Sequence, residues 1–356
     1  MINKTNKNIW IILGLSAVGI RLLVGENSNF IEQYYARGLF VYIRKGLDSI
    51  NSIIFFFPVL YILLLAVFVQ IVRGFIRIFK KKTDWKKVLH SIVAFLSATI
   101  FLFLLLWGFN YARLPLEQQI QLNVQPLELE DLKTALYKAK EQSIEARQIV
   151  RADSLPINDN DLPPHLKEEL QNDLRIVLHN FGYPTNFEVK AQQLFPKGIL
   201  LRFSTLGVYF PWTGECNVDA GLHPLELPFV LAHELAHGYG ITDEGTCNFL
   251  AYLTCIRSSN PLVQYAGHFE YFTTLAYNYR RYQPDAIKEL FKALSADVRS
   301  DWTAILENHR HYPNLMPRLR RATYDAYLRV QGIEEGIQNY NRVLMLIQAY
   351  EQKISK

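Results

Sequence analysis

The sequence predicts a mostly helical α+β protein, with three amino-terminal transmembrane helices followed by a domain that carries a small antiparallel sheet. Half of the 356 residues are hydrophobic, and that excess is concentrated before residue 110. Beyond it, apolar residues recur mainly at helical spacing, apart from a β-rich stretch at 187–218. We therefore expect a membrane domain at residues 1–115 and a second domain at residues 116–356.

Three apolar runs make up the expected membrane domain, at about residues 9–24, 53–72 and 88–109. The second and third can cross a hydrocarbon core about 30 Å thick. The first is shorter and contains Arg21, but no small-residue cleavage site follows it, so we interpret it as a transmembrane helix rather than a signal peptide.

Basic residues indicate the orientation of these helices. The loop expected between spans two and three holds seven, whereas the loop expected between spans one and two holds three, offset by acidic residues. The positive-inside rule then predicts a cytoplasmic amino terminus and an extracytoplasmic location for everything after Phe109. The seven are Arg73, Arg77, Lys80, Lys81, Lys82, Lys86 and Lys87.

Composition excludes several classes of function. The net charge of +5 is mild and gathers at one membrane face, so we expect no nucleic-acid partner. The three cysteines, Cys216, Cys247 and Cys255, give no disulfide framework. No Gly-rich phosphate loop and no G-x-S-x-G motif occurs.

The second domain is expected to be helical on both sides of its β-rich stretch. Helices are predicted at 126–151, 261–281, 284–294, 300–309, 319–330 and 336–352, and a further helix is predicted to end near residue 180. Strands are predicted at 187–190, 199–203 and 208–210.

The motif His233-Glu234-x-x-His237 lies in a further predicted helix that starts near Pro228 and ends near Gly238. Residues four apart share one helix face, so both imidazoles can bind one Zn²⁺. Glu234 follows the first ligand directly, where its carboxylate can act as general base on a zinc-activated water.

A third protein ligand is needed, and two acidic residues are available. Glu244, followed four residues later by Asn248, resembles the ligand helix of gluzincins, in which a polar residue orients the metal-binding side chain. Asp243 instead completes a pattern that resembles metzincins. We favour Glu244, because a helix holds a ligand rigidly and Asp243 is well placed as a helix N-cap. Asp243 stays the alternative.

The chain also resembles an uncharacterised family of bacterial membrane proteins built on the zincin pattern. The matching segments are Thr213-Gly214-Glu215-Cys216-Asn217, His233 to His237, Gly240, Glu244 and Asn248 to Tyr252. One departure is Thr246, where many relatives have a second Glu. The resemblance implies a zinc-peptidase fold in the bacterial cytoplasmic membrane, and it implies no particular substrate.

These observations predict a membrane-anchored zinc metallopeptidase that hydrolyses peptide bonds. An edge strand before the HExxH helix would bind the peptide main chain, through Gly207, Val208, Tyr209, Gly214 and Asn217. An oxyanion donor is also required; His268, His309, His311 and Tyr312 are candidates only by type and position, and we assign none. The alternative is a catalytically inactive scaffold with the same fold that binds an envelope protein.

Overall fold

The computed structural model describes residues 4–25, 27–53, 57–79 and 84–355. The chain divides into two compact units. The first unit comprises Met1–Leu114 and Phe210–Glu215, and the second comprises Pro115–Tyr209 and Cys216–Lys356. The break after Leu114 lies one residue before the boundary expected from the sequence. The short segment Phe210–Glu215, which we expected in the second domain, belongs to the first unit.

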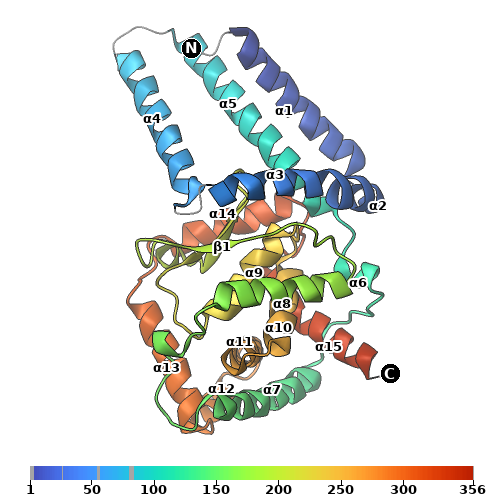
Figure 1. The fold of residues 1–356 in the computed structure, drawn as a ribbon, viewed down its shortest axis with the longest axis vertical. Helices are drawn as coiled ribbons and strands as arrows, with labels where there is room; N and C mark the ends of the chain where they lie inside the picture. Colours follow the sequence, from blue (N-terminus) through green and yellow to red (C-terminus); the bar gives the residue numbers. More distant parts are fainter. Residues whose placement is uncertain (1–3, 26, 54–56, 80–83, 356) are drawn as a thin grey trace. The chain divides into compact units, whose positions relative to one another are not determined.

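Three helices of the first unit are long and apolar enough to cross a bilayer, which marks the chain as a membrane protein (Figure 1). They are α1 (Lys4–Val24), α4 (Val59–Phe79) and α5 (Trp85–Leu106). The second begins later than predicted, directly after Pro58, because a proline is favoured at the start of a helix. Residues 54–56 of the predicted span, and Lys80 to Lys82 of the basic segment, lie outside the described residues.

The segment between spans one and two is helical, whereas we expected a loop. It forms α2 (Ser28–Phe30), the π-helix η1 (Ile31–Leu39) and α3 (Phe40–Ile53). Buried Glu32 accepts hydrogen bonds from Nε and Nη2 of Arg113, both at 2.8 Å, and also pairs with Arg37. Arg113 follows the 3₁₀ helix η2 (Gly108–Ala112), so this ion pair joins two segments far apart in sequence.

Within the first unit, Glu215 caps the amino terminus of α4. Its carboxylate accepts hydrogen bonds from the backbone N–H groups of Val59 and Leu60, at 2.6 and 2.8 Å. A carboxylate at this place satisfies free donors and complements the helix dipole. The Gly214 carbonyl accepts a hydrogen bond from Nη1 of Arg44 at 2.6 Å. The Thr-Gly-Glu part of the sequence pattern therefore has a structural role in the membrane unit.

The second unit is a helical domain around α9 (Leu227–Gly238) and α10 (Glu244–Arg257), both of which are almost wholly buried. Helix α10 packs against α8, α9, α11 and α15. The remaining helices are α6 (Leu116–Gln119), α7 (Leu129–Val150), η3 (Asp159–Asp161), α8 (Leu166–Asn180), η4 (Leu201–Phe203), α11 (Pro261–Tyr279), α12 (Pro284–Lys292), α13 (Ala296–Arg310), α14 (Pro317–Val330), η5 (Gly336–Asn341) and α15 (Arg342–Ile354).

The sheet has three strands in the order β1-β3-β2, namely β1 (Ala191–Leu194), β2 (Gly207–Phe210) and β3 (Glu215–Asp219). β1 pairs with β3 in parallel, with Gln192 opposite Asn217. The connection of four residues between β2 and β3 joins antiparallel neighbours. The sheet is thus mixed rather than wholly antiparallel, and the mostly helical α+β fold is confirmed.

Two predicted strands are wrong. Residues 199–203 form a turn and η4, because the carboxylate of Asp219 accepts hydrogen bonds from the backbone N–H groups of Gly198, Leu200 and Leu201, at 2.7, 2.6 and 3.1 Å. Residues 187–190 form a loop. Val189 packs against Gly238, the last residue of α9, and the Phe187 ring lies 5.1 Å from that of Tyr239, which follows it.

Candidate metal centre

Helix α9 places His233 and His237 on one face, one turn apart, as the sequence predicted. Their Nε2 atoms lie 3.1 Å apart, and their ring centres are 4.8 Å apart with the rings nearly perpendicular. The helix stops directly beyond the second histidine, and Gly240 turns the chain back with φ of +82°. This turn brings the carbonyl of Ile241 to 2.8 Å from Nδ1 of His237.

Glu244, the first residue of α10, completes the group. Its Oε2 atom lies 3.2 Å from Nε2 of His233 and 3.4 Å from Nε2 of His237. The ligand atoms of the three buried side chains all fall within 4.8 Å of one another, so the group could hold a metal ion. Glu244, and not Asp243, is the acidic residue that the structure brings to the histidine pair.

Both imidazoles are oriented through their other nitrogen. Nδ1 of His233 lies 2.7 Å from Oδ1 of Asn248, and Nδ1 of His237 faces the Ile241 carbonyl. Because both partners are acceptors, each Nδ1 carries the proton in the neutral ring, which leaves the Nε2 lone pair for a metal. Asn248 therefore orients a histidine, whereas we had expected it to orient the carboxylate ligand.

Asp243 has a different role. Its Oδ1 atom accepts hydrogen bonds from the backbone N and Oγ1 of Thr246, at 2.7 and 2.6 Å, as an N-cap of α10. Its Oδ2 atom accepts from Asn339 at 2.8 Å and pairs with Arg342 at 3.1 Å. Both carboxylate oxygens are thus engaged away from the histidines. Thr246, the departure from the family pattern, completes this cap.

Glu234 is buried beside the ligands. Its Oε2 atom has no hydrogen-bond partner in the described part of the chain. Burial raises the pKa of this carboxyl to about 7. A buried carboxylate oxygen without a partner is costly, and such groups commonly mark a site where a ligand or water is to be bound.

The electrostatics of the three ligands favour a positive charge between them. Burial opposes ionisation of Glu244, but the two histidines outweigh it and hold its pKa well below the usual range. Burial likewise opposes protonation of His237, yet contacts with Cys247 and Glu244 raise its pKa well above the usual value. Two imidazoles and one carboxylate form a donor set typical of catalytic zinc sites, which leave a fourth position open.

The predicted substrate strand is only partly at this centre. Gly207, Val208 and Tyr209 lie in β2, which is an edge of the sheet. A Cβ atom placed on Gly207 would lie 2.5 Å from Oε1 of Glu234, so the edge strand passes directly over this carboxylate. Asn217 is fully buried in the central strand β3, whose backbone already has neighbours on both sides, and Gly214 belongs to the membrane unit. The predicted substrate roles of these last two residues are not supported.

The four oxyanion candidates are placed as follows. His309 donates to Oε1 of Glu226 at 2.8 Å, and Tyr312 packs against Gly198 and Gly221. His311 is exposed, and the His268 ring packs near Tyr252. The phenol that reaches the metal ligands is instead Tyr324 of α14, which hydrogen-bonds Glu244. Sequence inspection missed it, because Tyr324 is 80 residues from Glu244 and belongs to no motif.

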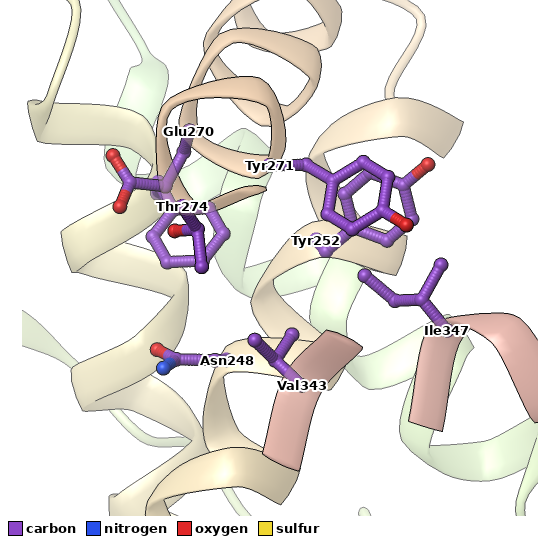
Figure 2. Close-up of a pocket in the computed structure, with 8 residues that line it drawn as sticks. Asn248, Tyr252, Glu270, Tyr271, Thr274, Val343 and Ile347 are labelled. Carbon is purple, nitrogen blue, oxygen red and sulfur yellow. The ribbon is translucent and has the colours of Figure 1, made fainter. Parts of the chain in front are cut away.

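Asn248 also lines a small pocket of about 20 Å³, which has room for one water. Figure 2 shows Glu270 and Thr274 on one side of this pocket and the rings of Tyr252 and Tyr271 on the other. Burial, with the nearby charge of Glu226, raises the pKa of Glu270 to about 7. The pocket is too small for a peptide side chain, so we assign no ligand to it.

The chain matches a family model when it is compared with known proteins. The model of a family described as "protein of unknown function (DUF3810)" matches residues 35–348, which include parts of both units and every residue of the candidate metal centre. No curated protein and no solved structure matches the chain.

Proposed function

The chain belongs to the DUF3810 family, and we propose that it is a membrane-anchored zinc-dependent peptidase. One observation carries the proposal: ligand atoms of His233, His237 and Glu244 lie within 4.8 Å of one another. The buried carboxyl of Glu234, adjacent to the first histidine, supplies the acid–base group that peptide hydrolysis requires.

A zinc ion held by these three residues would supply Lewis-acid polarisation of a carbonyl oxygen and lower the pKa of water to about 7. Glu234 takes the proton from the attacking water and delivers it to the amine of the departing peptide fragment. Asn248 and the Ile241 carbonyl hold the two imidazoles in the tautomer that binds metal. The water oxygen forms a bond to the carbonyl carbon and the scissile C–N bond breaks, which gives a new carboxyl terminus and a new amino terminus.

The edge strand β2 supports a peptide as the substrate. An extended peptide can add to an exposed sheet edge through main-chain hydrogen bonds, which gives little sequence preference. Gly207 lets the strand approach Glu234 closely, since any side chain there would meet the carboxylate. A peptide bound along β2 would thus pass beside the general base.

The bilayer and the orientation form part of the proposal. Three apolar helices anchor the chain, and the surplus of Lys and Arg at residues 73–87, around the end of α4 and the start of α5, favours the cytoplasmic side for that segment. We propose the bacterial cytoplasmic membrane, with the metal centre on the extracytoplasmic side. The substrate pool is then made of envelope peptides or proteins.

The Glu234→Gln variant tests this proposal. A neutral amide of the same shape cannot accept the proton, so the full-length variant should retain its metal and lose proteolysis of a fluorescently labelled unfolded protein such as casein. The matched control is Glu188→Gln, which changes an exposed carboxylate and should leave cleavage unchanged. Equal cleavage by wild type and Glu234→Gln would reject the mechanism.

A catalytically inactive scaffold is the alternative. It is favoured by the short gap between His237 and the third ligand and by the lack of a recognisable oxyanion donor in the sequence. The proximity of Glu244 to both histidines weakens the first of these arguments. A protein that binds zinc but cleaves nothing, with or without Glu234, would favour the scaffold.

A further inference from the structure

Tyr324 contacts the oxygen of Glu244 that faces away from the histidines. Its Oη atom lies 2.6 Å from Oε1 of Glu244, whereas Oε2 of the same carboxylate lies 3.2 and 3.4 Å from the two histidine Nε2 atoms. Oε1 of Glu244 therefore faces the phenol, and Oε2 faces the place where a metal would lie. Glu244 is buried, so water cannot readily replace the phenol.

Arg320 supports the phenol from one turn earlier on α14. Its guanidinium carbon lies 5.3 Å from the centre of the Tyr324 ring, within the range of a cation–π contact. Its Nη2 atom donates to Oγ1 of Thr205 at 2.9 Å, two residues before the start of β2. Helix α14 is thus fixed both to the third ligand and to the chain that leads into the edge strand.

We propose that Tyr324 is a positioning residue for Glu244. The phenol O–H donates a hydrogen bond to Oε1 and holds the carboxylate in the rotamer that directs Oε2 toward the two histidines. A carboxylate without this bond could rotate about its terminal torsion, which is broad and roughly two-fold. Fixing that torsion in advance raises metal affinity, and partners of this kind commonly contribute about 10–100-fold. The inference rests on the metal site of the proposed function but not on peptidase activity.

A purely structural role is the competing explanation, since the same bond also joins α14 to α10. The two roles predict different effects on the environment of the bound metal. Loss of a structural tie would lower stability and leave the metal environment of the folded protein unchanged. Loss of a positioning bond changes the position of Glu244 on the metal, and the visible absorption spectrum of bound Co²⁺ is sensitive to that change.

The test uses the full-length protein in detergent as wild type, Tyr324→Phe and Tyr327→Phe. Tyr327 lies on the same helix, with its ring 6.1 Å from that of Tyr324, so it is a matched control for the loss of one phenol. Zn²⁺ affinity is measured against a competing chelator, and Co²⁺-loaded samples give the spectra. We expect Tyr324→Phe to weaken Zn²⁺ binding by about 10–100-fold and to alter the Co²⁺ spectrum. Tyr327→Phe should do neither.

Wild-type affinity together with a wild-type Co²⁺ spectrum in Tyr324→Phe would overturn the inference. If that variant does not fold, Arg320→Met provides the second test, because it removes the cation behind the ring and keeps the hydroxyl. Weaker Zn²⁺ binding by Arg320→Met supports the inference, and unchanged binding contradicts it. A wild type whose zinc affinity depends on Tyr324 but which cleaves nothing would reject the peptidase alone, and a wild type that binds no metal would reject both.

Discussion

Nδ1 of His233 lies 2.7 Å from Oδ1 of Asn248, fifteen residues further along the chain. This contact gives Asn248 an orienting role beside a ligand set of His233, His237 and Glu244. We expect Glu244→Ala to lower zinc affinity steeply, because it removes an anionic ligand. Asn248→Ala should cost about 10–100-fold in affinity. Zinc titration of the purified variants checks both.

Asp243→Ala is the contrasting variant in that series. It removes the N-cap of α10 and the contacts with Asn339 and Arg342, so stability should fall by about 1–2 kcal/mol while zinc is retained. Loss of zinc in Asp243→Ala, with full retention in Glu244→Ala, would reverse the assignment of the third ligand.

Gly207→Ala should abolish proteolysis and leave zinc content unchanged. The added Cβ atom would lie 2.5 Å from Oε1 and 2.6 Å from Cγ of Glu234, which forces either the carboxylate or the edge strand to move. The control is Gly46→Ala in α3, where the added Cβ meets no atom within 4 Å. Peptidase assays and metal analysis of the same samples show whether proteolysis is lost while zinc is retained. Wild-type turnover in Gly207→Ala would mean that β2 does not hold substrate over Glu234.

A buried ion pair makes the second unit sensitive to the loss of either partner. Arg147 of α7 and Asp301 of α13 are fully buried and pair at 2.7 Å, and Asp301 also accepts from the Tyr265 hydroxyl at 2.8 Å. Removing one partner leaves an uncompensated buried charge, so Asp301→Ala should cost about 3–5 kcal/mol. Urea unfolding followed by circular dichroism measures the loss. The double variant Arg147→Met/Asp301→Leu should lose less, and an equal or larger loss would argue against this explanation.

The orientation in the membrane can be tested with a reporter fused after Lys356. If the basic segment at residues 73–87 is cytoplasmic, a reporter that functions only outside the cytoplasm should be active. A reporter active only in the cytoplasm would contradict the proposed orientation and make the substrates cytosolic. The fusion tests orientation independently of metal binding.

The sequence predicted those parts of the protein that depend on local patterns. The spacing of His233 and His237 fixes their shared helix face, and apolar periodicity located α7 and α11 to within three residues at each end. The three apolar helices followed from length and composition, although Pro58 delayed the start of the second. The third candidate ligand could also be predicted, because Glu244 lies close to His237 in the sequence and begins the next helix.

Interactions between distant residues could not be predicted in this way. The Asp219 carboxylate converts residues 199–203 from an expected strand into a turn, and nothing in that stretch indicates its partner. The contact of Tyr324 with Glu244 depends on the packing of α14, which no periodicity in α14 or α10 describes. Gly207 gave no signal of its approach to Glu234, because close contact of a backbone and a carboxylate is a property of the folded chain.

The zinc content of the purified full-length protein tests the central claim most directly. After dialysis against metal-free buffer and measurement by mass spectrometry, the wild type should retain close to one zinc per chain. The variant His233→Ala/His237→Ala should retain almost none, whereas His311→Ala, which changes an exposed histidine away from the centre, should match the wild type. A wild type without zinc, or a double variant that keeps it, would contradict the assignment of this site as a zinc centre.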